Sequence, residues 1–197
     1  MKSLSNVGAE RLGDALGESI DDGAKLSIIS SYFTVFAYGE LKEELSKVDE
    51  VRFLFSEPTF IKRMADSKEP REFEVARRAR EVGVGGSGLE LTLRNNLNQR
   101  ALARECAEWI REKGVFKSAK TSGAIQPGGT YVVENPSGND HAFMGAAANF
   151  TQEGLGYERR PGTVTCVSHF ENATEAVGLK MMFESVWDNP AMVEEVT

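Results

Sequence analysis

The chain has 197 residues with a formal net charge of -7 and 41% hydrophobic residues, so it is long enough to fold as one domain with a substantial core. Its 27% charged residues are ordinary for a soluble globular protein, and no apolar run approaches the roughly 20 residues of a membrane helix. The N-terminus also lacks the apolar stretch of a signal peptide. We therefore expect a single cytoplasmic domain with no membrane partner.

The charges are unevenly distributed along the chain. Residues 61–120 carry 14 Lys and Arg and 9 Asp and Glu, a net charge of +5, whereas residues 1–50 and 151–197 each have a net charge of -5. A basic segment in an acidic chain permits one electropositive face that could contact nucleic acid. A solvated helix surface with alternating charges gives the same composition, so both interpretations stay open at this point.

Helices and strands alternate at the start of the chain. Apolar residues at helical spacing predict a helix over residues 12–20, followed by a strand at 25–33, a helix at 38–48 and a strand at 51–55. This order is typical of an α/β sheet in which crossover helices join parallel strands. The predicted fold class is therefore α/β, with a mixed central sheet flanked by helices on both faces.

A glycine-rich break divides the middle of the chain. Residues 68–82 have a helical pattern, residues 83–88 match GxGxxG, and residues 89–93 alternate like a strand or an extended segment. A dinucleotide site needs a strand before such glycines and a helix after them, so this order argues against nucleotide binding there. The clearest helix follows at residues 98–113, with a strand expected at 115–117.

The last third predicts a strand, turn and strand around residues 130–145, followed by small residues that end at Asn149 and Thr151. Farther on we expect a strand at 163–168, a helix near 171–186 and the beginning of another helix at 191–197. An ending of that kind would suit a fragment of a longer protein. Cys106 and Cys166 lie among apolar residues, which predicts two buried thiols.

Histidine limits the catalytic chemistry, because His141 and His169 are the only two in the sequence. A nucleophilic site with a histidine base would have to use one of them. His141 begins the strand that leads toward Asn149, so it is the better catalytic candidate, whereas His169 is expected to be structural. Neither cysteine has a second Cys or His at metal-ligand spacing, so no metal or other cofactor is expected.

Several stretches resemble one family. Asn149-Phe150-Thr151 with Gly154-Leu155-Gly156 resembles the last motif of phospholipase D-like (HKD) domains, and KLSIISSYF and VRFLFSEP resemble the first two strands of that fold. The block LELTLRNNLNQRALARECAEWIREKGVFKSAKTSGAIQ resembles the N-terminal phospholipase D-like region of large bacterial DEAD/DEAH-type helicases. The resemblance covers residues 8–195. It implies a single phospholipase D-like domain over residues 1–197, as the N-terminal part of a longer helicase-like protein.

The catalytic motif of the family is degenerate in this chain, although Asn149 matches its asparagine. The substituted positions are Pro127 for the nucleophilic histidine, Gly129 for the lysine, Glu134 for the aspartate, and Ala146 and Ala147 for the glycine and serine. The family's chemistry needs one histidine as nucleophile and a second as acid, and a dimer of this chain would have neither at the motif position. The resemblance therefore implies a domain that is not an enzyme.

The resemblance implies an accessory domain that binds nucleic acid, DNA rather than RNA, or that positions a helicase motor in the same chain. The residues expected to contact phosphate are Asn149, Thr151, Arg94, Asn95, Gln99, Arg100 and Arg104. Three other functions stay open. They are a protein–protein or homodimerisation module, a phosphodiesterase or nuclease with a rearranged site at His141, and a nucleotide site at residues 83–88.

Overall fold

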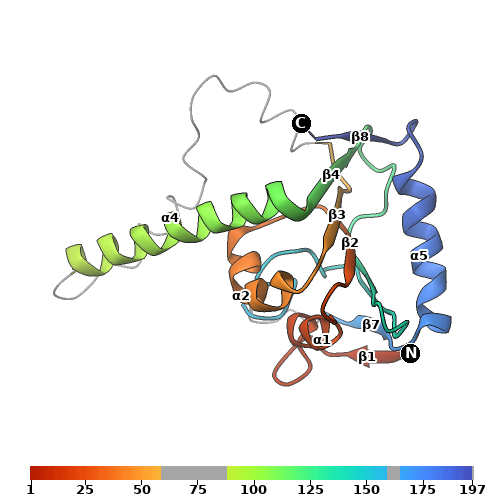
Figure 1. Cartoon of the computed structure of the whole chain (residues 1–197), viewed down its shortest axis with the longest axis horizontal. Helices are drawn as coiled ribbons and strands as arrows, with labels where there is room; N and C mark the ends of the chain where they lie inside the picture. The colour runs from red at the N-terminus through yellow and green to blue at the C-terminus, as the bar shows by residue number, and fades with distance from the viewer. Residues whose placement is uncertain (59–87, 159–164, 197) are drawn as a thin grey trace.

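The structure is a computed structural model that describes residues 1–58, 88–158 and 165–196, and for residues 88–98 it describes the backbone alone. The described residues form an eight-stranded sheet with helices on both faces (Figure 1). The strands are β1 (Lys2–Leu4), β2 (Lys25–Ser30), β3 (Glu50–Phe55), β4 (Gly114–Ala119), β5 (Gly129–Glu134), β6 (His141–Gly145), β7 (Val167–Phe170) and β8 (Val193–Glu195). The helices are α1 (Leu12–Glu18), α2 (Val35–Ser46), α4 (Gly88–Lys113) and α5 (Ala173–Trp187).

The sheet has a parallel centre and antiparallel flanks. Its strand order is β1-β7-β6-β5-β2-β3-β4-β8, and β2, β3 and β4 are parallel to one another. The remaining described pairings are antiparallel. α2 carries the chain from the end of β2 back to the start of β3, as a parallel pair requires. The predicted mixed sheet is confirmed.

The larger core lies between the sheet and α1, α2 and α4. Val51, Phe53 and Phe55 alternate along β3 and point to this face, where they are almost fully buried. Leu41 and Leu45 of α2 pack against the same face, and burying each such side chain contributes roughly 1.5–3 kcal/mol. The regularly spaced apolar residues of each strand and helix are therefore the ones that face this core.

α5 covers the opposite face of the sheet. Its helix begins where the Asn172 side chain accepts a hydrogen bond from Glu175 N, a standard N-cap arrangement. Phe183 and Trp187 pack against Ile29 and Leu54, which point away from the larger core because neighbouring strand residues alternate between faces. Helices on both faces of the sheet are therefore confirmed (Figure 1).

Several local predictions are wrong. Residues 89–93 belong to α4, which begins at Gly88, so their alternating pattern is part of a long helix. The chain end forms strand β8, because Val193 pairs with Ala119 at the edge of the sheet. β7 begins at Val167, later than expected, and residues 163–164 lie outside the described residues. Cys166 is exposed, and only Cys106 is buried as predicted.

Two predictions fall on residues that the structure does not describe. They are the helix at residues 68–82 and the first five residues of the GxGxxG stretch, residues 83–87. A nucleotide site was argued against because a strand-like run was expected after the glycines. That expectation is wrong, since helix α4 follows them. Within the described helices, no stretch is both long enough and apolar enough to cross a lipid bilayer.

Candidate functional site

Open α/β sheets bind ligands at the carboxyl ends of their parallel strands, and here that edge is formed by the ends of β2 and β3 with the start of β5. The chain returns to this edge after β6, where Phe150 forms a β-bridge with Phe33. Asn149 therefore lies at the edge where the sheet topology favours a ligand.

Asn149 ties the loop after β6 to the end of β2. Its Oδ1 accepts hydrogen bonds from Ser31 N at 3.0 Å and from Ser30 Oγ at 3.1 Å. The next residue continues the contact, since Phe150 N donates to Ser30 Oγ at 2.9 Å. Asn149 Nδ2 has no partner within the described part of the chain, so it is the polar group of this residue that a ligand can use.

Neutral hydroxyl groups dominate the rest of this edge. Ser31 Oγ and Ser56 Oγ lie 2.7 Å apart, and Ser122 Oγ donates to Glu57 Oε2 at 2.6 Å. No Lys or Arg side chain forms a hydrogen bond with any of these residues among those that the structure describes. Among the described residues, the hydroxyl groups of this edge are therefore bound to no Lys or Arg, the cations that normally balance a bound phosphate.

Gly129 is the residue that the sequence resemblance aligns with a lysine, and the backbone leaves no room for a side chain there. A Cβ on Gly129 would lie 1.5 Å from the carbonyl oxygen of Ala148. Tyr131 holds the same carbonyl in place, because its hydroxyl donates to Ala148 O at 2.6 Å. The loop after β6 is thus packed directly on the start of β5, in space that a lysine would need.

The other residues that differ from the family motif lie at the two ends of β5. Pro127, Ala146 and Ala147 are exposed, and a Cβ on neighbouring Gly128 would lie 3.2 Å from Ala146 Cα. Glu134 is at the opposite end of the strand and belongs to a different set of contacts. The structure therefore brings Pro127 and Gly129 close to the 146–150 loop and leaves Glu134 away from them.

Thr151 has a local structural role. Its Oγ1 accepts a hydrogen bond from Gly154 N at 3.0 Å, and its own N donates to Asn149 O at 2.8 Å. Gly154 packs so tightly here that a Cβ would lie 2.0 Å from Asn149 O. Thr151 thus closes the turn that holds Asn149, and Gly154 is required there by the close approach of the backbone.

The predicted arginines lie on α4, away from the carboxyl edge. Arg100 and Arg104 are exposed, Gln99 is half-buried, and the side chains of Arg94 and Asn95 are outside the description. The inner side of this helix packs on α2 through Leu102, Cys106 and Trp109, whose Nε1 donates to Leu45 O at 3.3 Å. Figure 1 shows the N-terminal half of α4 extending away from the sheet.

Three arginines share the outer face of this helix. Arg100, Arg104 and Arg111 are four and seven residues apart, which places them within about 40° of one another around the axis. All three are exposed, and none forms an ion pair or hydrogen bond with the described residues. Glu105 is on another side of the helix, where Lys42 pairs with it at 3.4 Å. We call Arg100, Arg104 and Arg111 the arginine row.

His141 lies at the far end of β6 from Asn149. Gly145 is four residues along β6 from His141, or about 13 Å at the usual rise of a strand. His141 Nδ1 is instead 3.2 Å from His169 Nε2, and Asn139 Nδ2 is 3.0 Å from His141 Nε2. The Asn139 amide nitrogen donates to His141 Nε2, which must therefore be unprotonated in the neutral ring. The proton of neutral His141 is then on Nδ1, which donates to His169 Nε2.

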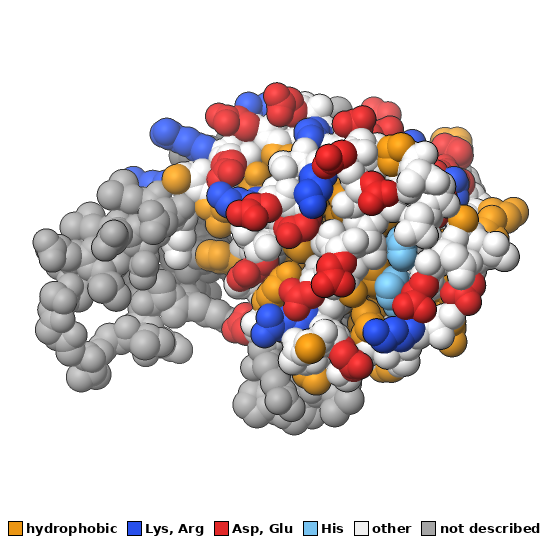
Figure 2. Space-filling view, turned by 60° about the horizontal axis from the view of Figure 1, so that its bottom comes forward, with side chains coloured by type: hydrophobic (Ala, Val, Ile, Leu, Met, Phe, Trp, Pro, Cys, Tyr) orange, Lys and Arg blue, Asp and Glu red, His pale blue; other side chains and the backbone are white. Residues whose placement is uncertain are grey.

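The two histidines line an acidic surface pocket of about 320 Å³ (Figure 2). Its carboxylates come from Glu10, Asp14, Glu18 and Glu171. Burial lowers the pKa of both histidines, and the neighbouring His141 lowers the pKa of His169 further. His169 also stacks on Phe143, with ring centroids 4.1 Å apart, so the structural role predicted for it agrees with its packing. A negative pocket with neutral histidines is poorly suited to a phosphodiester anion.

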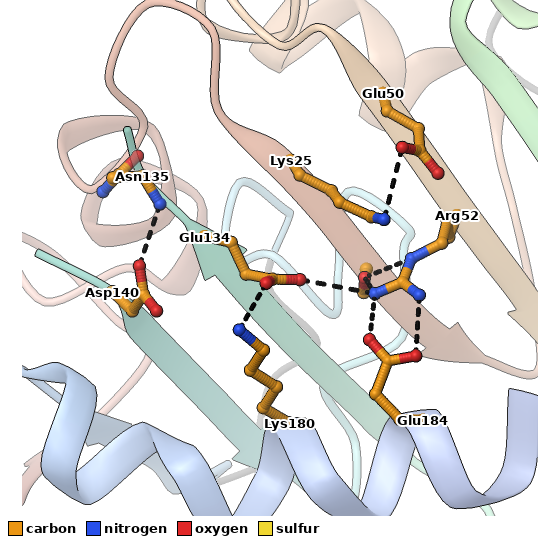
Figure 3. A network of polar contacts seen from close by, with 9 residues as sticks. Lys25, Glu50, Arg52, Glu134, Asn135, Asp140, Lys180 and Glu184 are labelled. Atoms are coloured by element: carbon orange, nitrogen blue, oxygen red, sulfur yellow. Dashed lines mark hydrogen bonds and ion pairs between the residues drawn. The ribbon is translucent and has the colours of Figure 1, made fainter. Parts of the chain in front are cut away.

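Glu134 belongs to a partly buried ion network that joins the sheet to α5 (Figure 3). Arg52 is 6% exposed and donates to Glu134 Oε1 at 3.3 Å and to both carboxylate oxygens of Glu184, at 2.7 and 2.9 Å. Lys180 forms an ion pair with the second oxygen of Glu134, and the hydrogen bond with Glu134 raises the pKa of Lys180. This network fixes α5 on the sheet and leaves Glu134 no free oxygen for catalysis.

No protein-family model matches this chain, and no match was found among curated proteins. Among the described residues, no three His, Cys, Asp or Glu side chains are placed to hold a metal ion.

The serines of the carboxyl edge and the partners of Arg52 were not predicted from the sequence. Ser30, Ser31 and Ser56 each follow an apolar strand, and that position is the signal that could have identified them. Arg52 interrupts the apolar run VRFLF, and a charge inside a buried strand indicates a buried partner. Which acids would pair with it could not be read from the sequence, because Glu134 and Glu184 are far along the chain.

Proposed function

We propose that this chain is a non-catalytic accessory domain that binds nucleic acid, DNA in preference to RNA, through the arginine row of α4. The observation that carries the proposal is the exposure of three arginines on one helix face with no anionic partner in the described residues. Unpaired guanidinium groups on a rigid helix are the groups that contact a phosphate backbone, since each can donate two parallel hydrogen bonds to one phosphate.

The spacing of the row suits a backbone. At 1.5 Å per residue, Arg104 lies about 6 Å and Arg111 about 16 Å along the helix from Arg100. Phosphates of one strand follow each other at about 3.4 Å along the axis of B-DNA, so the row can reach several of them without reading a base. The row also lies in the segment of residues 61–120 with a net charge of +5, which attracts a polyanion to this part of an acidic chain.

The carboxyl edge of the sheet is not the main binding surface in this proposal. Its hydroxyls and Asn149 Nδ2 are uncharged, and Gly129 is packed against Ala148, so no phosphoryl group is bound or attacked there by the family's chemistry. The absence of a histidine at the motif position supports binding without cleavage.

The wider context rests on the sequence resemblance. The block that begins at residue 89 resembles the start of bacterial DEAD/DEAH-type helicases, and the mixed sheet with helices on both faces is compatible with a phospholipase D-like fold. We propose that a helicase motor in the same chain acts on the nucleic acid held by this domain, in the cytoplasm. Helicase motifs in the reading frame downstream of Thr197 would support this context, and an unrelated sequence there would contradict it.

The binding proposal is tested by fluorescence anisotropy of the full chain with a labelled single-stranded DNA, a duplex and an RNA of the same sequence. The variant Arg100→Gln/Arg104→Gln/Arg111→Gln should weaken DNA binding at least about tenfold, since each lost phosphate contact removes part of the electrostatic affinity. The matched control Lys2→Gln/Lys47→Gln/Lys120→Gln removes the same charge from exposed positions elsewhere. Equal loss in both variants would show that net charge, rather than the row, governs binding.

A further inference from the structure

We infer that protonation of His141 and His169 releases strand β1 from the edge of the sheet, so that this end of the domain is an acid-sensitive switch. β1 is the outermost strand and pairs with β7 (Figure 1). His169 is the residue of β7 that lies opposite Lys2 in this pairing. The inference is separate from nucleic-acid binding, because it does not involve the arginine row.

The contact between the two histidines requires at least one neutral ring. His141 Nδ1 donates to His169 Nε2 across 3.2 Å, so this nitrogen of His169 carries no proton. Asn139 Nδ2 likewise needs an unprotonated Nε2 on His141. Two protonated rings would bring an N–H group of each together at this distance, and both rings would be positively charged. Acid therefore removes both hydrogen bonds and replaces them with repulsion.

β1 adds positive charge beside His169 and helps to bury it. Burial lowers the pKa of His169 most, and the charges of His141, Lys2 and the N-terminal amine lower it further, whereas Glu171 raises it. Lys2 and Leu4 line the same pocket as both histidines, so moving β1 away opens the rings to water. The released state therefore binds protons more readily than the closed state, and a lower pH favours release.

The acidic groups around the two histidines do not oppose this release, because none of them belongs to β1. They come from the segment before α1, from α1 and the turn after it, from the turn before β6, and from the start of α5 and the residue that follows β7. These groups are Glu10, Asp14, Glu18, Asp21, Asp140, Glu171 and Glu175. They stay beside the histidines in both states and stabilise the protonated rings in each. What differs between the states is the burial and the positive charge that β1 supplies.

The contacts that hold β1 are few. Leu4 is its buried apolar side chain, and the N-terminal amine pairs with Glu175 at 2.7 Å between exposed groups, a kind of contact that is worth little. Short edge elements of this kind open at a lower cost than the core. Asn6 limits the release, since its Nδ2 donates to Gly154 O and its Oδ1 accepts from Leu12 N, at 2.9 and 2.8 Å. The segment that leaves therefore ends at residue 5.

Amide hydrogen exchange of the full chain, followed by NMR at pH 7.5 and pH 5.0, tests the inference. Each rate is divided by the rate of an unstructured chain at the same pH, because exchange itself depends on pH. The protection of β1 should fall about tenfold or more, since one proton bound with a pKa one unit higher shifts an equilibrium tenfold. The protection of β2 should change much less. Unchanged protection of β1 would overturn the inference.

Two variants test which groups drive the release. His141→Gln/His169→Gln should lose the pH dependence of β1 protection, because glutamine does not titrate. Lys2→Gln keeps both histidines and should reduce the dependence, because the pKa of His169 in the closed state then lies closer to its released value. Lys47→Gln removes the same charge from an exposed position elsewhere and should behave like the unchanged chain. The same pH dependence in all four proteins would overturn the inference.

A disulfide can hold β1 closed. Ser3 Oγ lies 2.8 Å from Cys166 Sγ, so Ser3→Cys brings two sulfur atoms close enough to bond. In the oxidised variant β1 cannot leave, and NMR titration should give a lower pKa for His169 than in the reduced variant. The unchanged chain under the same oxidising conditions is the control. Equal pKa values of His169 in the oxidised and reduced variant would show that its protonation is not coupled to β1 and would overturn the inference.

Discussion

Arg52 of β3 and Glu184 of α5 form two hydrogen bonds, of 2.7 and 2.9 Å, across the smaller core of the domain. Arg52 is also beneath the ring of Phe183, with its guanidinium carbon 4.8 Å from the ring centroid. These contacts lower the pKa of Glu184, because the Arg52 hydrogen bonds favour the charged carboxylate. Arg52 therefore adds polar contacts to the apolar packing of Phe183 and Trp187 that holds α5 on the sheet.

Removing Arg52 should be destabilising. Arg52→Met leaves Glu184 without its cation, while Glu134 keeps Lys180. Because the Glu184 side chain is 36% exposed, we expect a loss of about 1–3 kcal/mol, below the full cost of breaking a buried pair. Urea unfolding measures this loss against the control Lys42→Ala, whose ion pair is 44% and 50% exposed and should be worth less than about 1 kcal/mol. The double variant Arg52→Met/Glu184→Leu should recover part of the loss. Equal costs for Arg52→Met and Lys42→Ala would contradict a buried role.

A single methyl group at position 129 should also be costly. In Gly129→Ala the new Cβ would overlap the carbonyl of Ala148, so the loop after β6 or the start of β5 has to move, at a cost of about 3 kcal/mol or more. Gly178→Ala is the matched control, and it should gain about 0.5–1 kcal/mol because it lies in a helix with open space around it. Similar unfolding midpoints for the two variants would argue against the packed arrangement.

Asn149 should stabilise the fold through its side-chain oxygen. Asn149→Ala leaves Ser31 N without its acceptor, whereas Ser30 Oγ keeps Tyr32 O at 2.8 Å, so the change should cost about 1–3 kcal/mol in thermal or urea unfolding. Asn149→Asp keeps an oxygen at the same place and should cost less. If both variants unfold at the same urea concentration as the unchanged chain, the hydrogen bonds are not holding the loop.

Stability should fall as the pH is lowered through the range in which free histidine takes up a proton. Burial keeps the pKa of His141 and His169 below the ordinary value near 6.5, so the unfolded chain binds more protons than the folded one in this range. The stability contributed by the neutral pair is complete above that value and is lost as the pH falls toward the folded pKa values. The urea midpoint at pH 7.5 and pH 5.5 measures it.

The double variant His141→Gln/His169→Gln is the control for that pH dependence. It should show a smaller drop in midpoint between the two pH values, because neither glutamine titrates. The groups facing the pair in the folded chain are Glu171, Asp21, Asp140, Lys2 and the N-terminal amine, and all of them remain in the variant. A drop of the same size in both proteins would assign the effect to those carboxylates.

The sequence predicted the parts of the fold that carry their own periodicity. The strands at residues 25–33 and 51–55, the helix between them and the 130–145 hairpin are present because each has one apolar face or a clear turn. β1 and β8 were missed because each has three residues and exists through pairing with β7 and β4. Such edge strands depend on neighbours that are distant in sequence, and no local pattern records them.

Features of the candidate site could be predicted only where they depend on one continuous stretch of sequence. Helical spacing placed Arg100 and Arg104 on the outer side of a helix, and the motif ending placed Asn149 at the edge of the sheet. The contact of Gly129 with Ala148 was not predictable, because it depends on how the loop after β6 returns to the sheet. The sequence also could not show that His141 faces His169 rather than Asn149.

The salt dependence of DNA binding tests the role of the arginine row most directly. The logarithm of the binding constant is measured against the logarithm of salt concentration for the unchanged chain and for Arg100→Gln/Arg104→Gln/Arg111→Gln. If the row contacts three phosphates, the slope of the variant should be less steep by about 2–3, since each contact contributes about 0.9. Equal slopes in the two proteins, or no salt-dependent binding by the unchanged chain, would contradict the proposed function.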